Sequence, residues 1–211
     1  MPLRSTGIFL AASINVTAKA IAEDIFGEFG GGKKKLLFIN TAAETKEGDL
    51  SWLDNDRNGL VKAGFEVEDF TITKKSQAEI KDAIKRSDVI HFNGGNSFYL
   101  LKQLQLTQSL QIFKETIEKG MLYTGSSAGS IIAAPDTYST RFLKKTADVG
   151  ENLPNYRGLA VVDFLVFPHW GSEHFKERYL KERMEVAYGG TDKIILLRDS
   201  QYVSVKDDFY Q

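Results

Sequence analysis

Short apolar runs alternate along this sequence with longer stretches that have the spacing of amphipathic helices. Two of the runs, LLFIN at 36–40 and VIHFN at 89–93, are apolar without a polar residue at every second position. Such strands are typical of a parallel sheet covered by helices, because both of its faces are buried. The pattern therefore predicts an α/β fold in three layers, with a doubly wound and mostly parallel sheet.

The alternation also places the individual elements. Strands are expected at Gly7–Ala12, Lys35–Asn40, Phe65–Thr71, Val89–Phe92, Leu122–Thr124, Phe164–Phe167, Lys193–Leu197 and Gln201–Val205. Helices are expected at Val16–Phe29, Leu50–Ala63, Ser76–Arg86, Phe98–Leu104, Leu110–Lys119, Ser127–Ala134 and Glu173–Tyr188. With 211 residues, 42% of them hydrophobic, and no internal repeat, we expect a single domain over residues 1–211.

Charge and composition exclude several classes of function. The 27 basic and 28 acidic residues are interspersed, which argues against nucleic acid or a membrane surface as partner and favours a small ligand. The absence of cysteine excludes disulfides, thiolate metal ligands and a cysteine nucleophile. The apolar stretch near the N-terminus is too short for a secretory signal, and no run approaches the roughly 20 apolar residues of a membrane span. We therefore expect a cytoplasmic protein.

The segment Gly125-Ser126-Ser127-Ala128-Gly129 fits the pattern G-x-S-x-G between an expected strand and an expected helix. Small residues at the glycine positions permit a sharp turn that lifts the serine hydroxyl above the sheet. The helix N-terminus behind it offers backbone N–H groups to a developing negative charge. The alternative is a structural glycine turn capped by serine. Strand, spacing and helix together favour Ser127 as a nucleophile.

A serine nucleophile needs a base, and the chain has three histidines. His91 lies within an apolar strand and is expected to be buried. His174 opens an amphipathic helix and is expected to be solvated. His169 follows a strand and Pro168, at the strand end where ligands gather in parallel sheets, and is the best candidate. A loop histidine packed on Trp170 is the structural alternative.

The base in turn needs an acid to fix its tautomer. Asp199, in the turn after the strand 193–197, is well placed, although aspartate is also ordinary in turns. Spacing alone leaves Asp136, Asp163 and Asp192 open as alternatives.

A second glycine turn, Asn93-Gly94-Gly95-Asn96, leads from a strand into a helix. Its amides are candidates for half of an oxyanion hole, but a helix cap or a phosphate cradle would have a similar sequence. A nucleotide site is the least favoured of these, since neither a G-x-G-x-x-G fingerprint nor a Walker lysine is present.

These segments together resemble the dipeptidase E family of serine peptidases, which includes cyanophycinase. The match rests on the Asn-Gly-Gly-Asn turn, the G-x-S-A-G elbow, Pro168-His169 after a strand, and an acidic turn before the last strand, and it spans Val89 to Val205. The chain order Ser127, His169, Asp199 differs from the serine, acid, histidine order of α/β-hydrolases.

The resemblance implies a fold like that of class I glutamine amidotransferases, which is flavodoxin-like, with serine in place of cysteine. It assigns Ser127 as nucleophile, His169 as base, Asp199 as the acid where the family has glutamate, the N–H groups of Gly95 and Ala128 as oxyanion hole, and Asn96 as a residue that shapes the site. The aspartate-recognising arginine of the enterobacterial dipeptidase corresponds in a gapped alignment to Lys176, with Arg178 close by. Ser126 stands where that enzyme has tryptophan before the nucleophile.

The predicted function is hydrolysis of short peptides through an acyl-enzyme, without metal or cofactor. Dipeptides with N-terminal Asp are one candidate substrate, although Lys176 cannot reproduce a bidentate arginine–carboxylate pair. The alternative is a non-catalytic or differently specific relative that binds a small ligand or a partner in the same cleft. A monomer and a dimer both fit the sequence.

Overall fold

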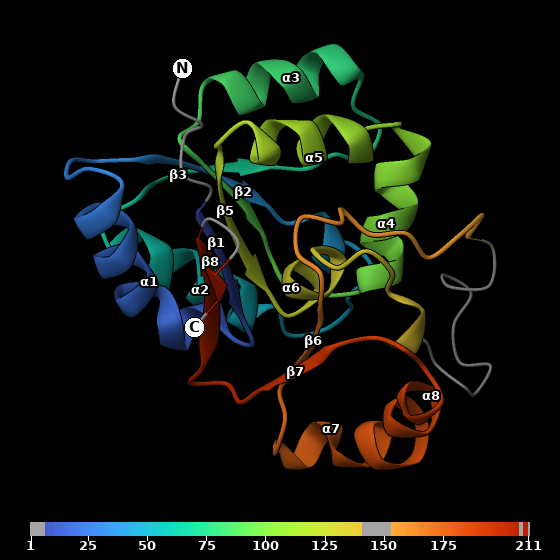
Figure 1. Ribbon diagram of the computed structural model, residues 1–211. Coiled ribbons are helices and arrows are strands. Elements are labelled where there is room, and N and C mark those ends of the chain that lie inside the picture. The colour runs from blue at the N-terminus through green and yellow to red at the C-terminus, as the bar shows by residue number, and fades with distance from the viewer. Residues whose placement is uncertain (1–6, 141–152, 207–208, 211) are drawn as a thin grey trace.

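The computed structural model describes residues 7–140, 153–206 and 209–210. A seven-stranded sheet with the order β3-β2-β4-β5-β1-β8-β9 forms its centre (Figure 1). The first five strands in this order are parallel, and β8 and β9 add antiparallel strands at the β1 edge. The strands are β1 (Gly7–Ala11), β2 (Lys35–Ile39), β3 (Glu66–Phe70), β4 (Val89–Phe92), β5 (Leu122–Ser126), β8 (Tyr202–Lys206) and β9 (Phe209–Tyr210).

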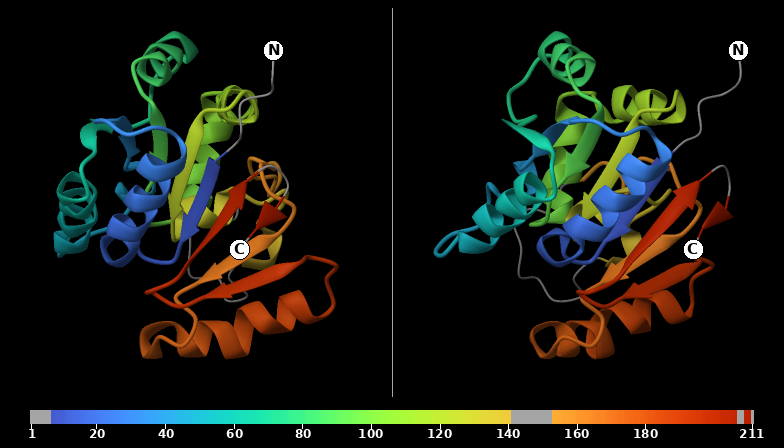
Figure 2. Two further views of the ribbon diagram at one scale, coloured as in Figure 1. Left: turned by 60° about the vertical axis from the view of Figure 1, so that its left-hand side comes forward. Right: turned by 90° about the vertical axis from the view of Figure 1, so that its left-hand side faces the viewer.

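Helices cover both faces of this sheet, as Figures 1 and 2 show. One face carries α1 (Ile14–Glu28) and α2 (Ser51–Lys62), and the other carries α3 (Gln77–Lys85), α4 (Ser97–Leu106), α5 (Leu110–Glu118) and α6 (Ala128–Ile132). Short 3₁₀ turns lie at Thr41–Ala43 and Tyr138–Thr140. The predicted three-layer α/β fold with a mostly parallel sheet is confirmed.

Strand β1 shows why an unbroken apolar run predicts such a sheet. Ile8 and Leu10 pack in the hydrophobic cluster under α3 to α6, whereas Phe9 and Ala11 pack in the cluster under α1. Successive side chains of a strand point to opposite faces, so every position must be apolar when helices cover both. All five residues of β1 are buried accordingly.

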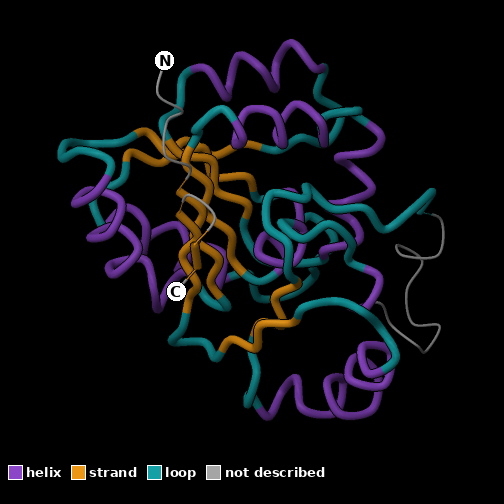
Figure 3. The backbone as a smooth tube through the Cα atoms, viewed as in Figure 1, coloured by secondary structure: helices purple, strands orange, loops and turns teal. Residues whose placement is uncertain are grey.

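The C-terminal third of the chain differs from the expectation of one continuous sheet. Strands β6 (Leu165–Pro168) and β7 (Ile194–Leu197) pair with each other, in parallel, in a separate two-stranded sheet. Figures 2 and 3 show this pair beyond one end of the central sheet, between it and the C-terminal helical segment. An apolar run predicts that a strand exists but not which strand it pairs with.

The helix expected at 173–188 is one helical segment with an irregular middle. It consists of α7 (Glu173–Arg178), a π-helical turn (Tyr179–Arg183) and α8 (Met184–Tyr188). Tyr179 belongs to one buried hydrophobic cluster with Phe167 and Leu165 of β6 and with Ile131 of α6, and this cluster joins the helical segment to the elbow helix. No helix in the described part of the chain is long and apolar enough to cross a membrane.

Candidate active site

A sharp turn joins β5 to α6, and Ser127 is its corner residue. Its φ of 49° and ψ of −103° are a conformation that residues with a side chain rarely adopt. The flanking glycines are required by close packing. A methyl group on Gly129 would lie 1.9 Å from the Phe92 carbonyl oxygen, and one on Gly125 would lie 2.8 Å from Ser130 N. The G-x-S-x-G pattern therefore corresponds to a strained turn with Ser127 at its corner.

The two serines beside Ser127 hold the elbow against its neighbours. The buried Ser126 hydroxyl accepts a hydrogen bond from Ile14 N–H at 3.1 Å, and the Ser130 hydroxyl donates to the Ala11 carbonyl at 2.7 Å. The Ser127 N–H donates to the same carbonyl at 3.0 Å. These bonds engage the Ser126 and Ser130 hydroxyls in the fold, whereas the Ser127 hydroxyl faces His169 in the cleft described below.

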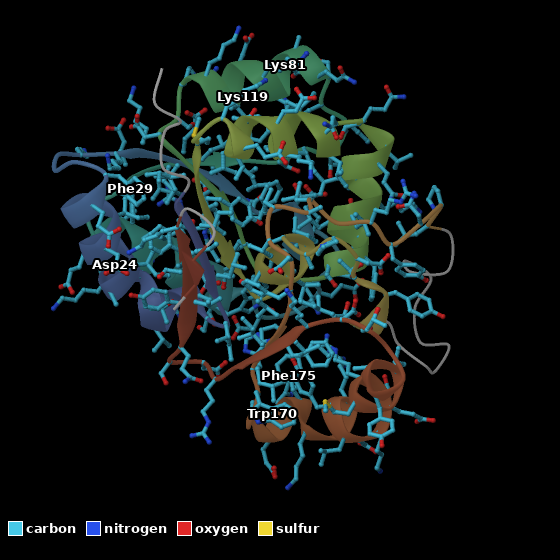
Figure 4. The ribbon with its side chains drawn as sticks, in the orientation of Figure 1. Asp24, Phe29, Lys81, Lys119, Trp170 and Phe175 are labelled. Carbon is cyan, nitrogen blue, oxygen red and sulfur yellow. The ribbon has the colours of Figure 1, made fainter. Side chains whose placement is uncertain are left out.

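His169 lies directly after β6 and faces Ser127. Its Nε2 is 3.0 Å from Ser127 Oγ. Its φ of 63° is another left-handed conformation, and Trp170 N–H bonds the Leu197 carbonyl at 2.9 Å, which ties this turn to β7. Phe175 of α7 stacks on the imidazole, with ring centres 4.6 Å apart and planes at 9°. Figure 4 shows Phe175 and Trp170 in this C-terminal part of the molecule.

Asp199 occupies the turn after β7, and its Oδ1 is 2.5 Å from His169 Nδ1. The parallel pairing of β6 with β7 explains the contact, because parallel strands end at the same edge and the residues that follow them are neighbours. The other candidate acids have different partners. Asp163 pairs with Lys193, Asp192 accepts from Ser139, and Asp136 caps the turn at Tyr138.

Burial determines the charge state of His169. Its side chain is 19% exposed, and this desolvation lowers the pKa of His169 below its ordinary value of 6.5, although Asp199 works in the opposite direction. The imidazole is therefore neutral at physiological pH. A neutral imidazole can accept a proton from Ser127, which is the property a general base requires.

The Asn-Gly-Gly-Asn turn lies beside the elbow. A methyl group on Gly94 would lie 3.4 Å from Ser127 Cβ. Gly95 has a φ of 138°, and a methyl group there would lie 2.1 Å from the Ala42 carbonyl oxygen, so only glycine fits. Within the described residues, the N–H groups of Gly95 and Ala128 donate to no backbone carbonyl. They are available to an oxyanion.

A cleft opens around Ser127, His169 and Gly95 and has two parts. The wide pocket, of about 380 Å³, is lined by residues of the β1–α1 turn, of α2 and of the elbow, among them Ser13, Trp52, Asp56 and Ser126. The narrow pocket, of about 110 Å³, is lined by the start of α4, by Ile131 and by the C-terminal helical segment. Asn96 lines the narrow pocket, where its Oδ1 also caps α4 by accepting from Phe98 and Tyr99 N–H.

The two cations that the resemblance indicated are separated in the structure. Arg178 lines the narrow pocket and lies over the Phe175 ring at 5.4 Å. Lys176 points elsewhere. It lines a different surface hollow and bonds Glu173 at 2.7 Å with its side chain 61% exposed.

Sequence reasoning missed Arg183, which lines the narrow pocket while only 6% exposed. Its Nη1 donates to Tyr179 Oη at 2.8 Å, and its guanidinium lies 4.9 Å from the centre of the Tyr179 ring. Its Nε has no hydrogen-bond partner, and among the described residues it forms no ion pair with a carboxylate. The π-helical turn changes which residues of this segment face inward, and a regular helical periodicity therefore gave no signal.

The remaining histidines behave as expected. His91 is fully buried, bonded to Thr124 and Asn93, and its pKa is lowered to about 4 by burial. His174 is exposed at the rim of the wide pocket. No group of three potential metal-binding side chains occurs in the parts of the chain that are described.

Comparison with known proteins identifies the family. The model of Peptidase family S51 matches residues 8–211. The chain belongs to this family. An uncharacterized peptidase from Pasteurella multocida is 32% identical over 172 residues, which cover 81% of this chain and 80% of that protein. A protein from Drosophila melanogaster named Probable alpha-aspartyl dipeptidase is 30% identical over 200 residues, 90% of this chain and 76% of its own length.

Two solved structures share the fold of this chain. A Listeria monocytogenes EGD-e protein named for Peptidase E superposes with a TM-score of 0.82 at 27% identity, over 98% of this chain and 97% of its own. A peptidase from an acI-B1 actinobacterium has a TM-score of 0.70 at 20% identity, over 97% and 86% of the two chains, and shows the shared fold. The S51 peptidase described here is thus a serine peptidase.

Proposed function

We propose that this S51 peptidase hydrolyses short peptides through an acyl-enzyme on Ser127, with His169 as base and Asp199 as its orienting acid. The observation that carries the proposal is the continuous series of contacts from Ser127 Oγ to His169 Nε2, at 3.0 Å, and from His169 Nδ1 to Asp199 Oδ1, at 2.5 Å. The strained elbow and the lowered pKa of His169 support the same assignment.

The reaction follows from this geometry. As Ser127 Oγ attacks the peptide carbonyl, its proton passes to His169 Nε2, and the carbonyl oxygen gains negative charge next to the N–H groups of Gly95 and Ala128. The imidazolium, stabilised by Asp199, then gives the proton to the leaving amine, and an ester of Ser127 remains. Water, deprotonated by His169, cleaves the ester and restores the free serine.

A fluorophosphonate probe tests the nucleophile directly, because only an activated serine reacts with it rapidly. We expect stoichiometric labelling at Ser127, located by peptide mass mapping. Absence of labelling on a folded protein would contradict the proposal and would favour the alternative, a relative that only binds a ligand in this cleft.

The pH dependence of labelling tests His169. Only neutral His169 accepts the serine proton, so the labelling rate should fall as pH falls through the pKa of His169, by about tenfold per pH unit at the acid end. Because burial lowers that pKa, the midpoint should lie below 6.5. A labelling rate that stays constant from about pH 5 to 8 would contradict the role of His169 as base.

We further propose that the narrow pocket accepts an acidic side chain of the residue whose carbonyl is attacked. Arg183 is buried there with an unpaired Nε, and Arg178 lines the same pocket. A buried guanidinium without a carboxylate partner is costly, and an acidic substrate side chain would supply the missing partner. The name of the Drosophila relative points to the same class of substrate, peptides with an aspartyl residue.

Arg183→Gln should lower the preference for Asp-Leu over Ala-Leu by about 10- to 100-fold. This ratio corresponds to the free energy of about one charge-assisted hydrogen bond or more. Rates of leucine release for the two dipeptides give this ratio. Lys176→Gln is the matched control, because Lys176 lies outside both pockets and should leave the ratio unchanged. The labelling rate of Ser127 shows whether the site is intact. An unchanged ratio in Arg183→Gln with normal labelling would contradict the assignment.

A further inference from the structure

The mechanism above leaves one buried ionisable group of the cleft without a role. Asp56, on α2, is 7% exposed and lines the wide pocket together with Ser127 and His169. It is the only carboxylate among the described residues that line this pocket. Sequence reasoning did not single it out, because an aspartate within a helix that has several polar residues is ordinary.

Two independent contacts place Asp56 close to the reacting serine. Trp52 and Asp56 are four residues apart and therefore lie on the same face of α2. Trp52 Cζ3 would lie 3.7 Å from a methyl group on Gly94, and Ser127 Cβ would lie 3.4 Å from the same methyl group. The inner face of α2 is thus directed toward the elbow.

The second contact runs through the first turn of α1. Ile14 N–H donates to Ser126 Oγ at 3.1 Å, and the next amide along the chain, Asn15 N–H, donates to Asp56 Oδ1 at 3.3 Å. Because successive amide groups of a helix are neighbours, their two acceptors lie side by side. The Asp56 carboxylate is therefore next to the residue that precedes the nucleophile.

Asp56 lacks a cationic partner. Within the described part of the chain, no lysine, arginine or histidine forms an ion pair with it. Burial raises the pKa of Asp56 to about 6, so the carboxylate is charged at neutral pH at a cost in free energy. Two exposed residues that can carry positive charge, Lys46 and His174, line the same pocket, but neither contacts Asp56 as an ion pair.

Capping of α1 does not by itself account for an aspartate at this position. One neutral oxygen, from serine or asparagine, satisfies a helix N–H equally well and avoids the desolvation of a charge. Asp56 accepts a long hydrogen bond of 3.3 Å from Asn15 N–H, and the nearby Asn93 side chain acts to lower its pKa, but both of these partners are neutral. A charged group held in this way is suited to bind a cation that enters the pocket.

We propose that Asp56 binds the protonated α-amino group of the substrate, so that this S51 peptidase acts on peptides whose first residue carries the carbonyl that is attacked. This inference rests on the proposed function. The ammonium nitrogen of a first residue is two bonds, about 2.5 Å, from its carbonyl carbon. A carboxylate that contacts it must therefore lie beside the nucleophile, as Asp56 does.

The proposal gives the two pockets opposite tasks. The wide pocket takes the ammonium group at Asp56, and the narrow pocket takes the acidic side chain at Arg183 and Arg178. The first residue of an aspartyl dipeptide carries both groups on one carbon framework. Charge complementarity of this kind fixes the register of the substrate. If the residue in the site had an acylated α-amino group, or lay inside a longer peptide, it would offer no ammonium group and would leave Asp56 buried and unpaired.

The test compares Asp-Leu and Ala-Leu with their N-acetyl forms, in wild type and in Asp56→Asn. Wild type should cleave the free dipeptides at least about 100-fold faster than the acetylated ones. Asp56→Asn should reduce kcat/KM for the free dipeptides by about 10- to 100-fold and leave any activity on the acetylated forms within a few-fold, so that the free-to-acetylated ratio collapses. Asparagine keeps the oxygen that caps Asn15 and should therefore preserve the fold.

Asp54→Asn is the matched control, because Asp54 lies two residues away on the same helix and is exposed. It should leave the ratio unchanged. Equal cleavage of free and acetylated dipeptides by wild type, or an equal loss on both in Asp56→Asn, would overturn the inference. Failure of the proposed function gives a different result, namely no labelling of Ser127 by the fluorophosphonate in any variant and no cleavage of any dipeptide.

Discussion

Replacing Ser127 by alanine should lower kcat for dipeptide cleavage by at least about 10⁴-fold, while the protein stays folded. The hydroxyl is the atom that forms the acyl-enzyme in the proposed reaction, and no cysteine exists to replace it. The fold should tolerate the change, because the side chain faces the cleft and alanine fits the same corner. Leucine release from Asp-Leu measures the rate, and thermal unfolding measures stability.

Ser126→Ala is the control for this experiment. Ser126 is adjacent, but its buried hydroxyl accepts from Ile14 N–H and takes no part in the proposed reaction. Its loss should cost about 1–3 kcal/mol of stability, since a buried N–H loses its acceptor, and fluorophosphonate labelling of Ser127 should persist. Activity of Ser127→Ala within a few-fold of wild type would contradict the assignment of the nucleophile.

The second large effect is expected at Asp199. Asp199→Asn should lower kcat by about 10²- to 10³-fold, because the amide cannot stabilise the imidazolium as a carboxylate does. The expected loss is smaller than the ~10⁴-fold loss at a fully buried triad acid. The Asp199 side chain is 52% exposed, so water can partly stabilise the imidazolium when the carboxylate is removed. Steady-state kinetics on Asp-Leu measure the change. Asp163→Asn is the control, because Asp163 pairs with Lys193 away from His169.

The length of the acid is a separate question, because the dipeptidase E family has glutamate where this chain has Asp199. The 2.5 Å contact with His169 Nδ1 indicates that aspartate reaches the imidazole directly. Asp199→Glu should therefore reduce turnover, since one more methylene must be accommodated in the same turn. A rise in turnover would show instead that reach limits the natural enzyme, and unchanged activity in Asp199→Asn would show that another group completes the site.

Much of the architecture could be predicted from local sequence patterns. Uninterrupted apolar runs identify strands that are buried on both faces, and the spacing of glycines around Ser127 identifies the elbow, because steric contact at Gly125 and Gly129 tolerates no side chain. His91 could be predicted as a buried residue for the same reason, since its strand has no exposed face. These features depend on residues close together in the chain.

The choice of partners was decided by tertiary structure. Asp199 contacts His169, and Asp192 does not, because β6 pairs with β7 in parallel and brings their ends together, a pairing that strand propensity cannot specify. Arg183 enters the narrow pocket through a π-helical turn that breaks regular periodicity.

Asp56 lies 71 residues before Ser127 in the sequence. It lines the wide pocket because α2 packs beside α1. The sequence by itself thus determined the fold class and named Ser127 and His169 as candidates for nucleophile and base, through short-range sterics and the tendency of functional residues to follow the ends of parallel strands. Tertiary structure alone decided which aspartate contacts His169 and which charged residues line the two pockets, because long-range packing sets which side chains share a cleft.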